Sequence, residues 1–157
     1  MGIEGKEHIT VSQKLYYNPN PNLSVLVYGS SFFMNTYDLI QDMTFSQARD
    51  WTAGTKVTYH VKDWFSVTGS LHADFYDRFK RHERIDKRQK DYESSIYQPR
   101  LTVTSNYFNG HSLILGMEHT SDELTSDRFS GNANHDLKTR ALKETEYFLQ
   151  DLSLIHI

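Results

Sequence analysis

WFSVTGSLHADFY, residues 64–76, is a stretch in which apolar and polar side chains alternate almost without interruption. One set of alternate positions is apolar or small: Phe65, Val67, Gly69, Leu71, Ala73 and Phe75. The other set is mostly polar: Ser66, Thr68, Ser70, His72, Asp74 and Tyr76. A period of two predicts a β-strand with one apolar face and one polar face. The segment is also much longer than the five or six residues of an ordinary strand.

Aromatic residues stand at both ends of the apolar face of this strand. Phe65 and Phe75 are ten residues apart, which is about 33 Å at ~3.3 Å per residue. A tilt of roughly 40° projects this length to about 25 Å, the height of the apolar band between the aromatic girdles of an outer-membrane barrel. Tyr97 and Tyr107 repeat the same offset. A long strand with aromatic ends therefore favours a membrane barrel over a soluble sheet.

The composition is compatible with such a barrel and disfavours several other classes of protein. The 157 residues suffice for one ordinary domain, 13% of them are aromatic, and the net charge of -3 gives no sign of a nucleic-acid partner. The absence of Cys excludes disulfides and thiolate zinc sites. Mean hydropathy is -0.63 and no apolar run is long enough for a transmembrane helix. Residues 1–6 lack the apolar region of a signal peptide, so we expect the N-terminus to be incomplete.

The whole chain reads as an all-β antiparallel meander of about seven long strands, a partial transmembrane β-barrel. We expect tight turns at Asn18–Asn22, Lys62–Asp63 and Asn109–Gly110, the last pair being a strong hairpin signal. Longer polar connections are expected at 38–47, 77–95 and 121–137, and Pro99 is expected at a rim or bulge. Short and long connections alternate, so the long ones share one end of the sheet, as in outer-membrane barrels. The alternative is a soluble β-sandwich that acts as a binding module. The expected strands are 8–17, 23–37, 48–61, 64–76, 96–107, 112–120 and 143–151.

Two segments carry a resemblance to a known family. LILGMEH at 113–119 is followed by a polar loop and then by EYFLQD at 146–151. This order resembles the TonB-dependent outer-membrane receptors, in which a strand ending in Gly-x-Glu-Tyr/His precedes a long loop and a strand ending in Phe-x-Gln-Asp. The upstream segment WTAGTKVTY, residues 51–59, is also similar to their barrel strands.

The resemblance implies a fragment of a larger receptor in the bacterial outer membrane. Residues 1–151 would supply about a third of a barrel of twenty-two strands, and neither the plug nor the TonB box is visible. The receptor would take up a scarce nutrient, cobalamin or a ferric siderophore, and would contact the TonB complex through the missing N-terminal part. Outer-membrane lipid and lipopolysaccharide are further expected partners. Residues 152–157, LSLIHI, depart from the family and are interpreted as a non-native tail encoded by a sequencing adapter.

A basic segment lies inside the connection predicted at 77–95. It is open to two interpretations: a solvated loop, or an external loop that pairs with lipopolysaccharide phosphates or another anionic ligand. Nucleic-acid binding is disfavoured because no aromatic platform interleaves the bases. The seven bases are Arg78, Lys80, Arg81, Arg84, Lys87, Arg88 and Lys90.

The sequence offers little for catalysis or for metal binding. His72, Asp74 and Glu118 are expected on the inward face, where they would either touch a substrate or serve as hydrated wall residues. His72 and His119 fall on opposite faces, and no His-x-x-x-His or Glu-x-x-His pair occurs. His72 and Asp74 lie two apart on one face, as acid/base residues can, but nothing supplies a nucleophile. No catalytic, cofactor-binding or metal-binding residue is therefore assigned, and the chain is not expected to be an enzyme.

Overall fold

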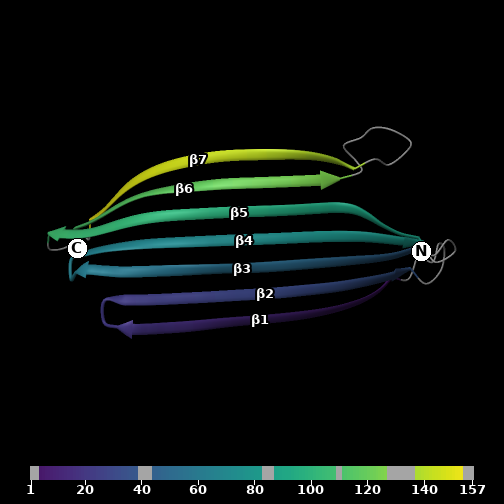
Figure 1. Cartoon of the computed structure of the whole chain (residues 1–157), viewed down its shortest axis with the longest axis horizontal. Helices are drawn as coiled ribbons and strands as arrows, with labels where there is room; N and C mark the ends of the chain where they lie inside the picture. The colour runs from purple at the N-terminus through teal and green to yellow at the C-terminus, as the bar shows by residue number, and fades with distance from the viewer. Residues whose placement is uncertain (1–3, 39–43, 83–86, 109–110, 127–136, 154–157) are drawn as a thin grey trace.

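Seven antiparallel strands form one sheet in a computed structural model that describes residues 4–38, 44–82, 87–108, 111–126 and 137–153. The strands pair in the order in which they occur along the chain, so the sheet is a simple meander (Figure 1). This all-β meander of seven strands confirms the predicted fold class. The strands are β1 (Glu4–Asn20), β2 (Leu23–Asp38), β3 (Thr44–Lys62), β4 (Phe65–His82), β5 (Lys87–Phe108), β6 (His111–Ser126) and β7 (Lys138–Ser153).

The strands are longer than predicted, and all three predicted long connections are shorter: 38–47 is reduced to 39–43, 77–95 to 83–86 and 121–137 to 127–137. Most of 77–95 continues β4 and β5, which leaves only residues 83–86 between them. Similarly, β6 continues to Ser126 inside the loop predicted at 121–137. The polar pattern of these extensions resembles that of a loop, and in β4 and β5 the charged side chains form ion pairs across the two strands.

The connections still differ systematically between the two ends of the sheet. Residues 21–22, 63–64 and 109–110 join strands at one end, whereas 39–43, 83–86 and 127–137 join strands at the other (Figure 1). The second turn is one residue later than predicted, at Asp63–Trp64. Asn109–Gly110 links β5 to β6 as expected, although its own conformation lies outside the described residues.

Side chains on the sheet divide into two faces by residue parity. The register pairs Trp51 with both Ser31 and Phe75, and pairs Phe75 with Ser95, so odd-numbered residues share one face of the sheet. We call this the odd face and its opposite the even face. At Asp91 a bulge in β5 shifts the register by one residue, which brings Lys90 to the odd face opposite Phe79.

The described residues contain almost no hydrophobic core. Ala48 is the only buried hydrophobic residue among them, with 2% of its surface exposed, and no large side chain is fully buried. A soluble domain buries an apolar sheet face against a second layer. Here the described strands form one layer, whereas a β-sandwich would divide them between two packed sheets.

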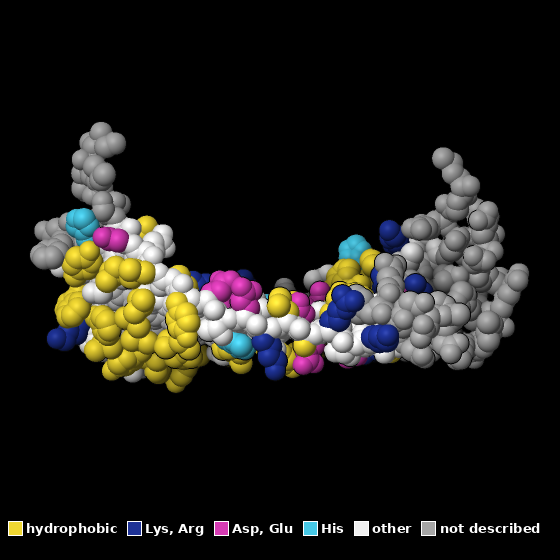
Figure 2. All heavy atoms as spheres, turned by 90° about the horizontal axis from the view of Figure 1, so that it is seen from above, with side chains coloured by type: hydrophobic (Ala, Val, Ile, Leu, Met, Phe, Trp, Pro, Cys, Tyr) yellow, Lys and Arg dark blue, Asp and Glu magenta, His cyan; other side chains and the backbone are white. Residues whose placement is uncertain are grey.

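The sheet is bowed from end to end. Figure 2, seen from above the β7 edge of Figure 1, shows hydrophobic side chains gathered at the end that holds the short turns. Charged side chains occupy the middle and extend toward the other end. On the side seen in Figure 2, the apolar surface is therefore concentrated toward the short-turn end.

Two aromatic rings lie flat across glycines on the even face. Tyr28 of β2 covers Gly54 of β3 and reaches β4, where its hydroxyl is 3.0 Å from Nδ1 of His72. Phe148 of β7 covers Gly116 of β6 in the same way and stacks with the guanidinium of Arg100 on β5, 4.8 Å from the ring centroid. Each ring therefore connects three adjacent strands, because only glycine leaves room for it.

Gly54→Ala is expected to lower the free energy of unfolding by about 1–3 kcal/mol, the usual cost of overpacking. A Cβ at this position would overlap the Tyr28 ring and separate it from His72. Gly69→Ala is the matched control, because a Cβ there meets no atom within 4 Å. Chemical unfolding in detergent micelles measures both variants. If the two variants were equally stable, the position of the Tyr28 ring would not depend on glycine at residue 54.

Pro99 does not lie where the sequence predicts. It pairs with Leu71 inside β5, far from either end of that strand. The pairing of β5 with β6 is interrupted at Gln98 and Pro99 and resumes at Arg100. A proline lacks the N–H that a ladder needs, and the sheet accommodates it by leaving this gap rather than by placing it at a rim.

Candidate functional site

Exposed aromatic rings form a row across the middle of the odd face. Trp51 and Phe75 are directly paired between β3 and β4. Their neighbours make edge-to-face contacts: Phe33 with Trp51 and Phe75 with Tyr97, both with ring centroids 5.3 Å apart. Trp51, Phe75 and Tyr97 expose between 39% and 50% of their surface. We call these four rings the mid-strand row.

A second set of rings lies at the short-turn end of the sheet. These four residues expose between 43% and 61% of their surface. Trp51 and Tyr59 are eight residues apart, and Tyr97 and Tyr107 are ten apart, which corresponds to about 26–33 Å along the strands. The two rows therefore bound a band of roughly constant height. The members of this turn-end row are Tyr17, Tyr59, Trp64 and Tyr107.

Exposed aliphatic side chains fill the odd face between the two rows. On β1 to β6, within the described ranges, no Lys, Arg, Asp or Glu lies on this face between the rows; on β7, Asp151 lies opposite Leu113 and accepts a hydrogen bond from the Tyr107 hydroxyl at 3.4 Å. An uncovered apolar surface of this extent marks a protein interface or a membrane contact. We call this surface the apolar band; its exposed members are Val11, Leu15, Val27, Val57, Leu71, Leu101, Leu115, Met117, Tyr147 and Leu149.

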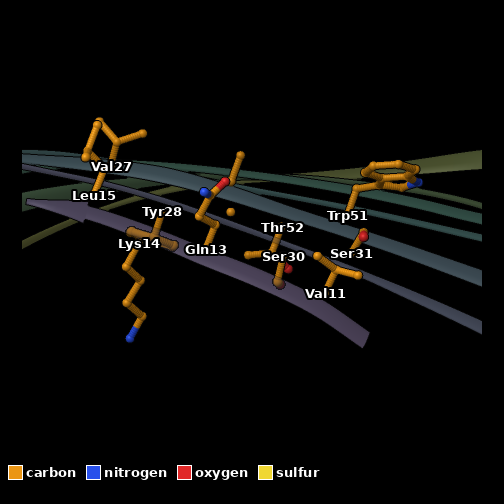
Figure 3. A pocket seen from close by; sticks show the side chains of 12 residues that line it. Val11, Gln13, Lys14, Leu15, Val27, Tyr28, Ser30, Ser31, Trp51 and Thr52 are labelled. Carbon is orange, nitrogen blue, oxygen red and sulfur yellow. The ribbon is translucent and has the colours of Figure 1, made fainter. Parts of the chain in front are cut away.

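The apolar band contains an open hollow of about 610 Å³ over β1, β2 and β3. Figure 3 shows Leu15, Val27 and Trp51 standing on one side of the sheet and Lys14 on the other. The floor is low because Gly29 and Ala53 are small residues that lie between these larger ones. The hollow therefore suits an apolar chain that lies along the sheet surface rather than an enclosed ligand.

The even face is polar along the same part of the strands that carries the apolar band on the odd face. The structure places His72, Asp74 and Glu118 on this face, as predicted, but it does not bring them together as one cluster. His72 contacts Tyr28, the Asp74 carboxylate accepts a hydrogen bond from Thr52 at 3.0 Å, and Glu118 pairs with Arg100 at 3.6 Å. His119 lies on the odd face, with Nδ1 2.8 Å from the Thr145 hydroxyl. None of these contacts joins two of the three residues His72, Asp74 and Glu118.

Ion pairs hold β4 and β5 together beyond the mid-strand row. Asp91 is only 3% exposed and accepts hydrogen bonds from Arg78, the shortest at 2.8 Å, while the Lys80 ammonium lies 3.1 Å away. Lys90 pairs with Asp77 at 2.7 Å and with Glu93 at 2.8 Å. The basic segment is thus not simply a solvated loop: three of its bases bind carboxylates, and the side chains of 81–89 lie outside the described residues.

Acidification is expected to loosen this part of the hairpin. Burial on its own would raise the pKa of Asp91, but hydrogen bonds and charge from Arg78 and Lys80 outweigh it and hold the pKa below its ordinary value of 3.8. A lowered pKa means that the stabilisation is complete above 3.8 and is lost as the pH falls below it. Protection of the amides at 77–80 and 90–93 from hydrogen exchange should therefore decrease below about pH 4. The decrease should be smaller in Asp91→Asn. An identical decrease in the variant would exclude Asp91 as the cause.

Sequence reasoning missed Asp50 and Asp91. Asp91 lies in a region predicted as a loop, and its burial results from a bulge that the sequence pattern does not reveal. Asp50 lies within the strand predicted at 48–61 and nothing in the sequence distinguishes it except its position at polar parity next to a tryptophan, yet its Oδ1 is buried without a hydrogen-bond partner among the described residues.

No family model, curated protein or solved structure matches this chain. Within the described ranges, no helix is long and apolar enough to cross a membrane. The same ranges hold no group of three or more His, Cys, Asp or Glu side chains placed to bind a metal ion. The two faces of the sheet are therefore the features that bear on function.

Proposed function

We propose that this chain is part of the wall of a bacterial outer-membrane barrel, and that the barrel is a TonB-dependent receptor for a scarce nutrient. The observation that carries the membrane placement is the apolar band bounded by two rows of exposed rings on a one-layer sheet. Membrane barrels present an outward apolar band about 25 Å tall between aromatic girdles and a polar interior. The odd face would contact lipid, and the even face would line the lumen.

The strand directions support a larger barrel rather than closure of this sheet on itself. Each strand is antiparallel to the next, so β1 and β7, the two edge strands, run in the same direction. A closed antiparallel barrel needs an even number of strands. Pairing with an odd number of further strands would therefore complete the barrel and remove both edges.

The choice of a TonB-dependent receptor is supported by the two segments that carry the resemblance. Leu113–His119 and Glu146–Asp151 lie side by side in β6 and β7, with Leu115 opposite Leu149 and Glu118 opposite Glu146. Cobalamin or a ferric siderophore is the proposed cargo. The longer connections at 39–43, 83–86 and 127–137 would face outward, and the basic segment near them would meet lipopolysaccharide phosphates.

Depth-dependent quenching of tryptophan fluorescence tests the membrane placement. The two tryptophans, Trp51 and Trp64, belong to opposite rows, so both should lie near a lipid headgroup boundary. In single-tryptophan variants reconstituted in vesicles, lipids brominated near the headgroup should quench both residues more than lipids brominated near the acyl end. Leu101→Trp, placed between the rows on a background lacking the native tryptophans, should show the opposite order. Equal quenching at all three positions would contradict the proposal.

A further inference from the structure

A second hollow lies on the even face, where β3, β4 and β5 run side by side. It is an open hollow of about 510 Å³. It is separated by the sheet from the apolar band. Its lining combines charged, aromatic and hydroxyl side chains: Asp50, Asp74, Tyr76, Arg78, Tyr92 and Ser94.

The charge of this hollow is negative. Arg78 is the only base among the described residues that line it, and its guanidinium is bonded to Asp91 and lies 5.6 Å from the Tyr92 ring centroid. Asp50 and Asp74 are close enough to interact electrostatically. Their mutual repulsion is therefore not offset by Arg78, and a cation between them would relieve it.

Hydrogen bonding inside the hollow is incomplete. Asp74 Oδ2 accepts a hydrogen bond from the Thr52 hydroxyl at 3.0 Å. Asp50 Oδ1 is buried and has no hydrogen-bond partner within the described part of the chain. A buried acceptor without a donor is unfavourable, and more so when the group is charged. A positive charge placed beside this carboxylate would therefore bind favourably.

Aromatic rings supply a surface for the apolar part of such a ligand. Tyr76 and Tyr92 meet edge to face, with centroids 5.5 Å apart and planes at 78°. Arg78 already lies over Tyr92, which shows that this ring pair accepts a cation. Carboxylates beside aromatic rings form a suitable environment for an organic cation.

We propose that this hollow binds a small organic cation, an ammonium or guanidinium group carried on an apolar body. The cation would donate hydrogen bonds to Asp50 and Asp74, and its body would lie against Tyr76. A neutral polyol would supply donors but would leave the repulsion between the carboxylates, and an anion would increase it. This inference goes beyond the proposed receptor function and depends on the hollow alone, so it stands or fails separately from the membrane placement.

Calorimetric titration of the full chain in a non-ionic maltoside detergent tests this site, with benzylammonium as the probe. Benzyl alcohol is the matched neutral probe, because it has the same ring. Titration into empty micelles is the blank that corrects for partitioning into detergent. We expect saturable binding of benzylammonium and at least ten-fold weaker binding of benzyl alcohol. Asp50→Asn and Asp74→Asn should each weaken benzylammonium binding at least ten-fold, because each removes one negative charge with little change in shape.

Asp122→Asn is the control variant. Asp122 also lies on the even face and also has a buried Oδ1 without a partner among the described residues, but it does not line the hollow. Its substitution should leave benzylammonium affinity unchanged. Sorbitol is the neutral polyol probe. Any of four results would overturn the assignment: no saturable binding of benzylammonium, equal affinity for benzyl alcohol, tighter binding of sorbitol than of benzylammonium, or an unchanged affinity in Asp50→Asn. The comparison of probes needs no variant, so it remains decisive if a substitution disturbs folding.

Discussion

Leu101→Arg is expected to reduce the membrane-inserted fraction of the chain more than any other single change considered. Leu101 lies on the odd face in the middle of the apolar band, pairs with Gly69 and Met117, and exposes 44% of its surface. An arginine on the lipid face at mid-depth costs about 2–4 kcal/mol, which corresponds to roughly a 30- to 800-fold shift in the equilibrium. Protease protection after reconstitution in vesicles measures the inserted fraction.

Thr102→Arg is the matched control for this experiment. Thr102 is the next residue of β5 and lies on the even face, opposite Thr68 and Gly116. An arginine there would reach water in the lumen of a barrel, so insertion should change little. If both variants lose insertion equally, the two faces do not differ in their surroundings, and the assignment of the odd face to lipid is incorrect.

Asp91→Ala is expected to cause the second largest loss, by destabilising the β4–β5 hairpin beyond the mid-strand row. The substitution leaves Arg78 and Lys80 without the carboxylate that they share. Breaking a fully buried pair costs about 3–5 kcal/mol. Because both bases remain partly exposed to water, we expect about 2–3 kcal/mol here. Hydrogen exchange of amides 77–80 and 90–93 measures this local loss directly.

Glu93→Ala serves as a comparison for Asp91→Ala. Glu93 belongs to the same hairpin but is 51% exposed and shares Lys90 with Asp77. A surface pair of this kind contributes about 0–1 kcal/mol. Its removal should therefore leave amide protection nearly unchanged. A similar loss in both variants would indicate that burial of Asp91 is not what makes its ion pairs important.

The fold could be predicted where apolar and polar residues alternate along a strand with a period of two. Alternation at 64–76 gives the strand and its two faces directly, and Asn109–Gly110 marks a connection that the structure contains. The hairpin at 77–95 could not be predicted in this way. Its residues are polar on both faces, so the period is lost, and the segment becomes a strand only because its charges meet across β4 and β5.

The candidate sites were less predictable than the strands. The parity of Leu101 or Trp51 already assigns each to an apolar face, because a strand turns successive side chains to opposite sides. The hollow at Asp50, by contrast, gathers residues from three strands, and only the pairing register decides which of them become neighbours.

By itself, the sequence determined that the chain forms long strands with one apolar and one polar face, since that property requires only a repeat of two along the chain. Tertiary structure alone decided which residues are adjacent across strands: the alignment of the rings into two rows, the Tyr28 ring over Gly54, and the burial of Asp91 at a bulge. These depend on register, and a shift of one residue would move every side chain to the other face.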